Sequence, residues 1–205
     1  MKKLVSLLMV LLLVSLPVFA EETAEVKKLA KEKIDIVINL LRVEKDKKLR
    51  NKKIIEALDP IFDFEQMAKV SLGKTGWMAM NAEQQKEFNL LFVKRLQESY
   101  LEKLDLYTDE KVTVDEATEV QTQSGKARIY VTTHLISADD KKEMVYRFYK
   151  NDTHWLVYDV EIMGVSVVQT YRSQFAGILA KGSVEDLLAK LRKQGEFSVP
   201  TGSKG

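Results

Sequence analysis

The sequence predicts an α+β domain in which helices cover one face of a curved, four-stranded antiparallel sheet. Three strand-like segments follow one another between residues 127 and 162, with polar turn residues between them. The chain before and after these segments shows apolar residues at the three- and four-residue spacing of amphipathic helices. Helices on either side of a run of strands are typical of α+β folds.

The first twenty residues are expected to be a cleaved secretory signal peptide. Residues 1–3 are cationic, residues 4–16 are almost entirely apolar, and Val18 and Ala20 occupy the −3 and −1 positions before Glu21. An uncleaved membrane anchor is the alternative, but a span needs about 20 apolar residues and Pro17 interrupts this segment. We therefore expect one exported domain at 21–195 and a flexible tail at 196–205.

The charge and the absence of cysteine exclude several classes of protein. Lys2 and Lys3 precede the predicted cleavage point, so 30 of the 32 basic residues remain beside 30 acidic ones. A formal charge of zero gives no reason to expect a nucleic-acid partner. The chain has no cysteine, which excludes disulfides and the cysteine to which a bacterial lipoprotein is anchored.

Four helices are expected before the sheet. The first, at 23–42, carries one apolar stripe; the second, at 46–58, begins with Asp46 as a cap; the third is short and begins at Asp63. Residues 72–77 are expected to be a glycine-hinged loop that carries Trp77. The longest helix begins at Asn81, where the sequence matches a capping box, and ends near Leu104.

The strands are expected at 111–120, 127–135, 144–149 and 155–162. The last two are predicted to form a hairpin with a two-residue loop at Asn151-Asp152. This register places three pairs on one apolar face: Phe148 with Trp155, Tyr146 with Val157, and Met144 with Asp159.

Two more helices are expected after the strands. Gly164 ends the last strand, and Ser166 caps a helix that runs to Leu179. A final helix begins at Ser183. With a further short turn of helix allowed for, we expect about seven helices to cover the sheet.

The sequence offers little support for catalysis or metal binding. His134 and His154 lie on different segments without cysteine or carboxylates at ligand spacing, so we interpret them as solvated strand residues. Asp159 and Glu161 are two residues apart and could act as a carboxylate pair, but pairing with a basic neighbour is the commoner role. Ser166 lacks the flanking glycines of a nucleophile elbow.

Residues 164–175, GVSVVQTYRSQF, directly after residues 155–160, resemble the MlaC family, also called the toluene-tolerance auxiliary family. Phe62-Asp63-Phe64, Met67-Ala68, Leu72-Gly73, Trp77 and the helix from Gln84 to Tyr100 follow the order of that family. The resemblance covers most of residues 54–191 and is weaker before them.

The resemblance implies a periplasmic phospholipid carrier with a cystatin/NTF2-like sheet and an apolar pocket. Its implied partners are an outer-membrane lipoprotein complex and the substrate-binding subunit of an inner-membrane ABC transporter, and its implied role is in outer-membrane lipid asymmetry. We expect a monomer without a cofactor.

We infer the residues that line the pocket from the faces of the predicted strands and helices. From the sheet they are Ile129, Val131, Met144, Tyr146, Phe148 and Val157; from the helices they are Met67, Trp77, Phe92, Leu96, Val165, Val168 and Tyr171. Lys74, Arg147 and Arg172 are candidates for contact with a phosphate head group or with acidic partner surfaces.

Two other functions remain open at this point. The same apolar side chains could form a filled core in a non-catalytic interaction module. A small enzyme of this fold would instead need a polar, titratable cavity floor around Asp159.

Overall fold

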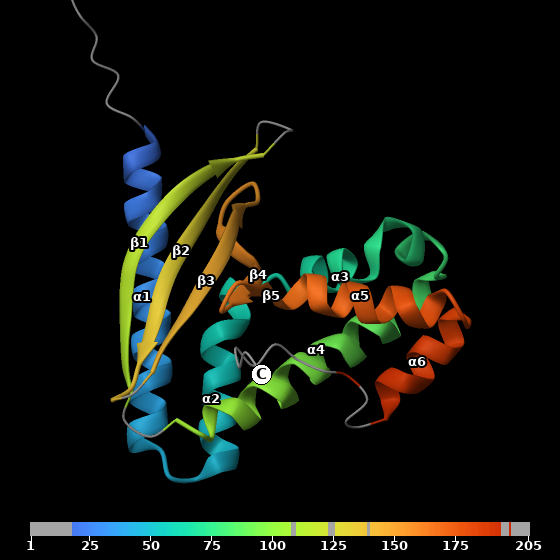
Figure 1. The fold of residues 1–205 in the computed structure, drawn as a ribbon, viewed down its shortest axis with the longest axis horizontal. Coiled ribbons are helices and arrows are strands. Elements are labelled where there is room, and N and C mark those ends of the chain that lie inside the picture. Colours follow the sequence, from blue (N-terminus) through green and yellow to red (C-terminus); the bar gives the residue numbers. More distant parts are fainter. Residues whose placement is uncertain (1–17, 108–109, 123–125, 139, 194–196, 198–205) are drawn as a thin grey trace, which may run out of the picture.

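The computed structural model describes residues 18–107, 110–122, 126–138, 140–193 and 197. These residues form six α-helices, one short 3₁₀ helix and one five-stranded antiparallel sheet. In Figure 1 a strongly curved sheet stands beside helix α1, and the helices α3 to α6 gather on the other side of the molecule. The predicted α+β class and the open curved sheet are confirmed.

Helix α1 runs alongside the sheet, and α2 follows it at one end of the molecule (Figure 1). Helix α1 (Val18–Val43) begins five residues before the predicted start, inside the predicted signal peptide, of which residues 1–17 lie outside the described residues. Val26 and Ala30 are its buried residues and pack against the sheet. Helix α2 (Lys47–Leu58) begins as predicted, with the Asp46 side chain accepting a hydrogen bond from the Leu49 amide.

Helix α3 (Phe64–Met78) corrects the prediction of a loop at residues 72–77. It follows the 3₁₀ helix η1 (Asp59–Ile61), and Asp63 caps it by accepting from the Gln66 amide. Only Gly73 leaves helical geometry, with φ 75° and ψ 159°, so the segment is a helix with a sharp kink. After the kink, the Trp77 ring packs against the Phe88 ring in a T-shaped arrangement. This contact stabilises the helical conformation at Trp77.

Helix α4 (Ala82–Leu104) has the predicted capping box. The Asn81 side chain accepts from the Gln84 amide, and the Gln84 side chain accepts from the Asn81 amide. Its inward stripe buries Phe88, Phe92 and Leu96 completely or nearly so. Local sequence therefore determines where this helix starts, and packing determines which face it buries.

The sheet is a meander with the strand order β1-β2-β3-β4-β5. Its strands are β1 (Lys111–Gln121), β2 (Ala127–Ile136), β3 (Lys141–Lys150), β4 (Trp155–Ile162) and the two-residue β5 (Val165–Ser166). The fifth strand is an addition to the four that were predicted, and it pairs with the end of β4.

The predicted register of the β3–β4 hairpin is wrong. The loop has four residues, 151–154, because Lys150 pairs with Trp155, and a bulge interrupts the ladder between Arg147 and Phe148. The observed pairs are Phe148 with Val157, Arg147 with Asp159, Tyr146 with Val160 and Met144 with Ile162. The Asn151 side chain accepts from the amides of Thr153 and His154, which stabilises the longer loop.

The chain returns to the helices at Gly164, whose φ of 79° suits glycine. Helix α5 (Val167–Leu179) then begins with the predicted Ser166 cap, and helix α6 (Val184–Arg192) begins with a second capping box at Ser183 and Asp186. Phe197, in the predicted tail, packs against the rings of Tyr171 and Phe175. Residues 196 and 198–205 of that tail lie outside the described residues.

A candidate lipid site between two apolar clusters

The apolar interior of the described residues is divided into two clusters. The helical cluster joins α3, α4, α5 and α6; its buried members include Met67, Phe88, Phe92, Tyr171 and Phe175. The sheet cluster joins α1 and η1 to strands β2, β3 and β4; it is built on Val26, Ile61, Ile129, Phe148 and Val157.

The two clusters meet along a seam of half-buried apolar side chains. Phe62 and Val160 pack against both clusters. Tyr146 packs against the sheet cluster, while Ile162 and Tyr100 pack against the helical cluster. Figure 1 shows the corresponding arrangement, in which the start of α5 and the end of β4 connect the sheet to the helices. This seam is our candidate site for an apolar ligand.

The predicted lining residues are distributed over both clusters. Met67, Phe92, Leu96, Val168 and Tyr171 are buried in the helical cluster, with Trp77 half-buried against it. Ile129, Val131, Phe148 and Val157 are buried in the sheet cluster, with Tyr146 half-buried against it. Met144 is half-buried and Val165 is 47 % exposed. Their role as ligand contacts stays a prediction.

The sequence reasoning missed four residues of the seam, which are Phe62, Tyr100, Val160 and Ile162. The predicted register, which pairs Tyr146 with Val157, implies that Val160 and Ile162 point to the opposite face. The bulge in the β3–β4 ladder shifts the alternation along β4 and pairs Tyr146 with Val160. Tyr100 was visible as part of the apolar stripe of α4, and Phe62 as an apolar residue next to the Asp63 cap. Both signals also fit ordinary packing.

Several phenol groups lie in strongly desolvating surroundings. Burial raises the pKa of Tyr146 and of Tyr171 to about 12. The pKa of Tyr100 is also raised, first by burial and then by the nearby Tyr171 and Asp159. The hydroxyl of Tyr100 is buried without a hydrogen-bond partner among the described residues. The seam is thus a low-dielectric region that contains an unused polar atom.

Asp159 connects the sheet to α5. It is 3 % exposed, and its carboxylate accepts hydrogen bonds from the Ser166 hydroxyl and the Val168 amide. Arg147 lies 3.3 Å from the same carboxylate and also pairs with Glu161. Burial raises the pKa of Asp159, against the lowering effect of these partners. The predicted pairing of this carboxylate with a basic neighbour is confirmed, and each of its oxygens has a structural role.

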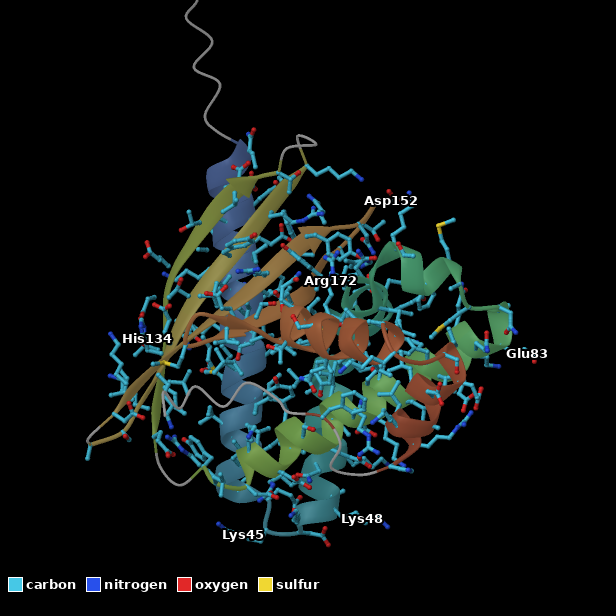
Figure 2. The ribbon with its side chains drawn as sticks, turned by 45° about the vertical axis from the view of Figure 1, so that its right-hand side comes forward. Lys45, Lys48, Glu83, His134, Asp152 and Arg172 are labelled. Atoms are coloured by element: carbon cyan, nitrogen blue, oxygen red, sulfur yellow. The ribbon has the colours of Figure 1, made fainter. Side chains whose placement is uncertain are left out.

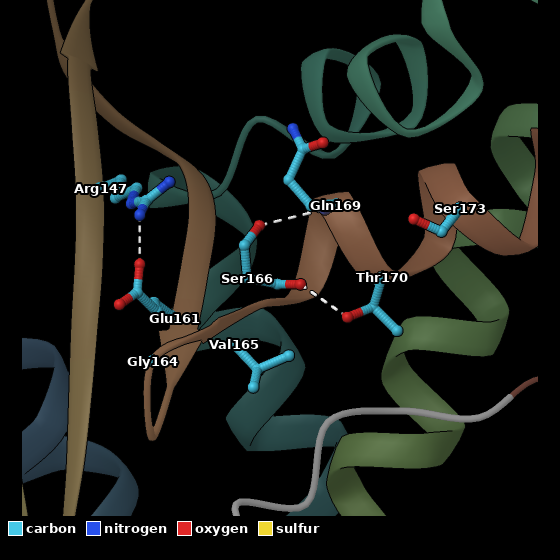
Figure 3. Close-up of a pocket in the computed structure, with 8 residues that line it drawn as sticks. All are labelled: Arg147, Glu161, Gly164, Val165, Ser166, Gln169, Thr170 and Ser173. Carbon is cyan, nitrogen blue, oxygen red and sulfur yellow. Dashed lines mark hydrogen bonds and ion pairs between the residues drawn. The ribbon is translucent and has the colours of Figure 1, made fainter.

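A polar pocket of about 410 Å³ lies beside this junction. Figure 3 shows its lining, in which the Ser166 hydroxyl accepts a hydrogen bond from the Gln169 amide and the Thr170 hydroxyl donates to the Ser166 carbonyl. The lining residues are Arg147, Glu161, Gly164, Val165, Ser166, Gln169, Thr170 and Ser173. This pocket is polar, whereas the predicted one is apolar.

The three predicted head-group residues do not converge. Arg147 follows Tyr146 on β3, so its side chain points to the opposite face of the sheet from Tyr146 and Phe148. There it lies over the Tyr130 ring at 5.2 Å and is neutralised by two carboxylates. Arg172, on α5, lies beside the Gly73 kink, with Lys74 next in the chain; both are exposed. Their proposed contacts with phosphate stay predictions.

The described residues contain no group of three or more histidines, cysteines or carboxylates arranged for a metal ion. His134 instead pairs with Asp115 and lies 3.6 Å from Glu143 on neighbouring strands. None of the described helices is long and apolar enough to cross a membrane.

Comparisons with known proteins agree with this architecture. The family model described as "MlaC protein" matches residues 31–193. The intermembrane phospholipid transport system binding protein MlaC of Haemophilus influenzae is 22 % identical over 163 residues, which cover 78 % of this chain and 74 % of that protein. A solved structure of a phospholipid-binding protein from Ralstonia solanacearum, in complex with a phospholipid, superposes with a TM-score of 0.71. That structure is 22 % identical, and the match covers 81 % of this chain and 94 % of the solved one. With a family match over most of its length, the chain belongs to the MlaC protein family.

Proposed function

We propose that this protein is a periplasmic phospholipid carrier that holds acyl chains along the seam between the two apolar clusters. The observation that carries the proposal is the division of the interior, because a seam of half-buried apolar side chains can admit a chain without breaking either cluster. The phospholipid bound to the relative of the same fold supports this interpretation.

The energetics of a lipid in water favour such an enclosed site. Burial of one methylene is worth about 0.8 kcal/mol, so exposing the roughly 30 methylenes of two acyl chains would cost on the order of 24 kcal/mol. A carrier must offer an apolar environment close to that of a bilayer and leave the head group at a polar rim. The seam supplies the apolar part, with Tyr146, Val160 and Ile162 as its central contacts.

The rest of the proposal concerns location and partners. The predicted signal peptide supports export to the periplasm, and the similarity to the Haemophilus influenzae binding protein supports a place in intermembrane phospholipid transport. We propose transient docking of the monomer to an outer-membrane lipoprotein complex and to the substrate-binding subunit of an inner-membrane ABC transporter.

A filled-core interaction module is the second candidate function. It is favoured by the complete burial of Phe92, Phe148 and Tyr171, which shows tight packing within each cluster. An enzyme has less support, since Asp159 is used to join β4 to α5.

Organic extraction of the purified protein, followed by mass spectrometry, separates these possibilities. The carrier predicts phospholipid in the extract and uptake of phospholipid from vesicles by delipidated protein. Lipid-free protein that takes up nothing would support the filled-core module instead.

A further inference from the structure

Positive charge is concentrated at the end of the molecule where α1 meets α2. Residues 42–53, RVEKDKKLRNKK, hold seven basic and two acidic residues, a formal charge of +5. Residues 21–205 together hold 30 basic and 30 acidic residues, so the rest of that chain is negative by the same amount. A neutral total thus conceals a local excess of positive charge.

Ion pairs fix the geometry of this end. Lys47 and Arg50 both pair with Asp105, directly after α4, and Arg42 donates to the Tyr107 hydroxyl. Residues 105–107 are therefore held against the turn between α1 and α2. Leu106 lies in the middle of this segment.

Two lysines at this end keep their charge available. Lys45 donates only to the Arg42 carbonyl, which leaves its charge without a carboxylate partner among the described residues. Lys48 is exposed and forms no ion pair within the described part of the chain. Figure 2 shows both side chains at the lower end of the molecule, far from Glu83 and from Arg172.

Exposed apolar side chains accompany these lysines. Val43 is 62 % exposed at the end of α1, Leu49 is 42 % exposed in the first turn of α2, and Leu106 is 76 % exposed. Together they make up three of the seven large apolar side chains that are exposed among the described residues. Apolar side chains that protrude among lysines match an interface with phosphate charges above and hydrocarbon beneath.

We propose that this basic end, formed by residues 42–53 and Leu106, docks on the surface of an anionic lipid bilayer. The lysine ammonium groups would lie at the lipid phosphates, and salt would weaken this attraction. Val43, Leu49 and Leu106 would enter the interface between head groups and acyl chains. The proposal does not depend on whether the seam holds a lipid, because no seam residue belongs to the basic end.

Flotation with vesicles tests the proposal on the protein without residues 1–20, so that the apolar leader cannot contribute. The vesicles contain phosphatidylcholine alone or phosphatidylcholine with phosphatidylglycerol, at low and high salt. We expect flotation only with the anionic vesicles and its loss at high salt. The double variant Lys45→Glu/Lys48→Glu should bind at least about tenfold more weakly.

Two further variants make the test specific. Lys86→Glu/Lys181→Glu makes the same change of charge at exposed lysines of the helical end and should bind like the wild type. Val43→Ser/Leu106→Ser keeps every charge and should weaken binding severalfold by removing the apolar contacts. Circular dichroism of each variant verifies that it is folded.

The proposal is overturned if the wild type does not float with anionic vesicles. This holds even if the basic end binds an acidic protein instead. Equal loss in the Lys86/Lys181 control would also overturn it, since binding would then follow total charge. Lipid content of the same samples is measured separately, so a failed docking test and a failed carrier test remain distinct.

Discussion

Arg147 on β3 and Asp159 on β4 face each other across the hairpin, 3.3 Å apart, and this pair joins the sheet to the start of α5. Asp159 reaches α5 through the Ser166 hydroxyl and the Val168 amide. The carboxylate that the sequence marked as a catalytic candidate is therefore a structural link. Its burial raises its pKa, which has a measurable consequence for stability.

The substitution Asp159→Asn should reveal this raised pKa. A carboxyl whose folded pKa lies above its unfolded value binds its proton more tightly in the folded state, so it contributes stability at low pH. The free energy of unfolding of the wild type, relative to the variant, should fall as pH rises from about 3.8 through the raised pKa, then stay level. Urea unfolding across this pH range measures the difference.

Glu161→Gln serves as the control for that experiment, because it removes the other carboxylate that Arg147 contacts. The quantity compared is the change with pH of the unfolding free energy of the wild type relative to each variant. If this change is the same for Asp159→Asn and Glu161→Gln, it reflects the charge around Arg147 in general, and the assignment to Asp159 is refuted.

Gly73→Ala should destabilise the fold by about 1 kcal/mol or more, because an L side chain is strained at a φ of 75°. The matched control is Gly177→Ala in α5, where an added methyl group meets no atom within 4 Å. That change should stabilise by about 0.5–1 kcal/mol. Urea denaturation gives both changes in unfolding free energy. Equal effects of the same sign in the two variants would contradict the claim that the positive φ at Gly73 requires glycine.

Arg95→Ala should weaken the attachment of α6. Arg95 is 8 % exposed and donates to the carbonyls of Leu191 and Lys193 at the end of that helix. Hydrogen bonds from a charged donor are worth about 1.5–3 kcal/mol, so we expect a loss in that range and faster amide exchange in residues 184–192.

The control for this loss is Arg192→Ala. Arg192 pairs with Glu87 and Glu185 at the surface, with its side chain 43 % exposed, so its removal should cost less than about 1 kcal/mol. Equal losses of unfolding free energy in the two variants would contradict the expectation that the buried arginine contributes more than the exposed one.

Ile162→Trp tests the seam directly. If the seam opens to admit an acyl chain, the larger side chain should displace lipid and leave the unfolding free energy of delipidated protein almost unchanged. If the seam is permanently filled, overpacking should cost about 1–3 kcal/mol without changing lipid content. Leu90→Trp, at a position 63 % exposed, is the control. It should change neither the lipid content nor the unfolding free energy.

Local chemistry explains which parts of the fold could be predicted from the sequence. The capping box at Asn81 and the Ser166 cap depend on residues within three positions of one another. Gly164 was correctly placed at the end of β4, because its positive φ is a local requirement.

Features that depend on distant parts of the chain were missed. The bulge after Arg147 reassigns the faces of β4, and it is accompanied by contacts of Asp159 with α5 that no local pattern encodes. The helix around Trp77 depends on Phe88, eleven residues later. The basic end was overlooked for a different reason, since a net charge of zero is a sum that conceals where the charges lie.

Native mass spectrometry of the protein purified without detergent tests the central claim most directly. We predict a main species with the mass of one chain plus one bound phospholipid, which converts to the bare chain when the complex is activated in the gas phase. Bare protein alone, before and after incubation with phospholipid vesicles, would contradict the account of a lipid held between the two apolar clusters.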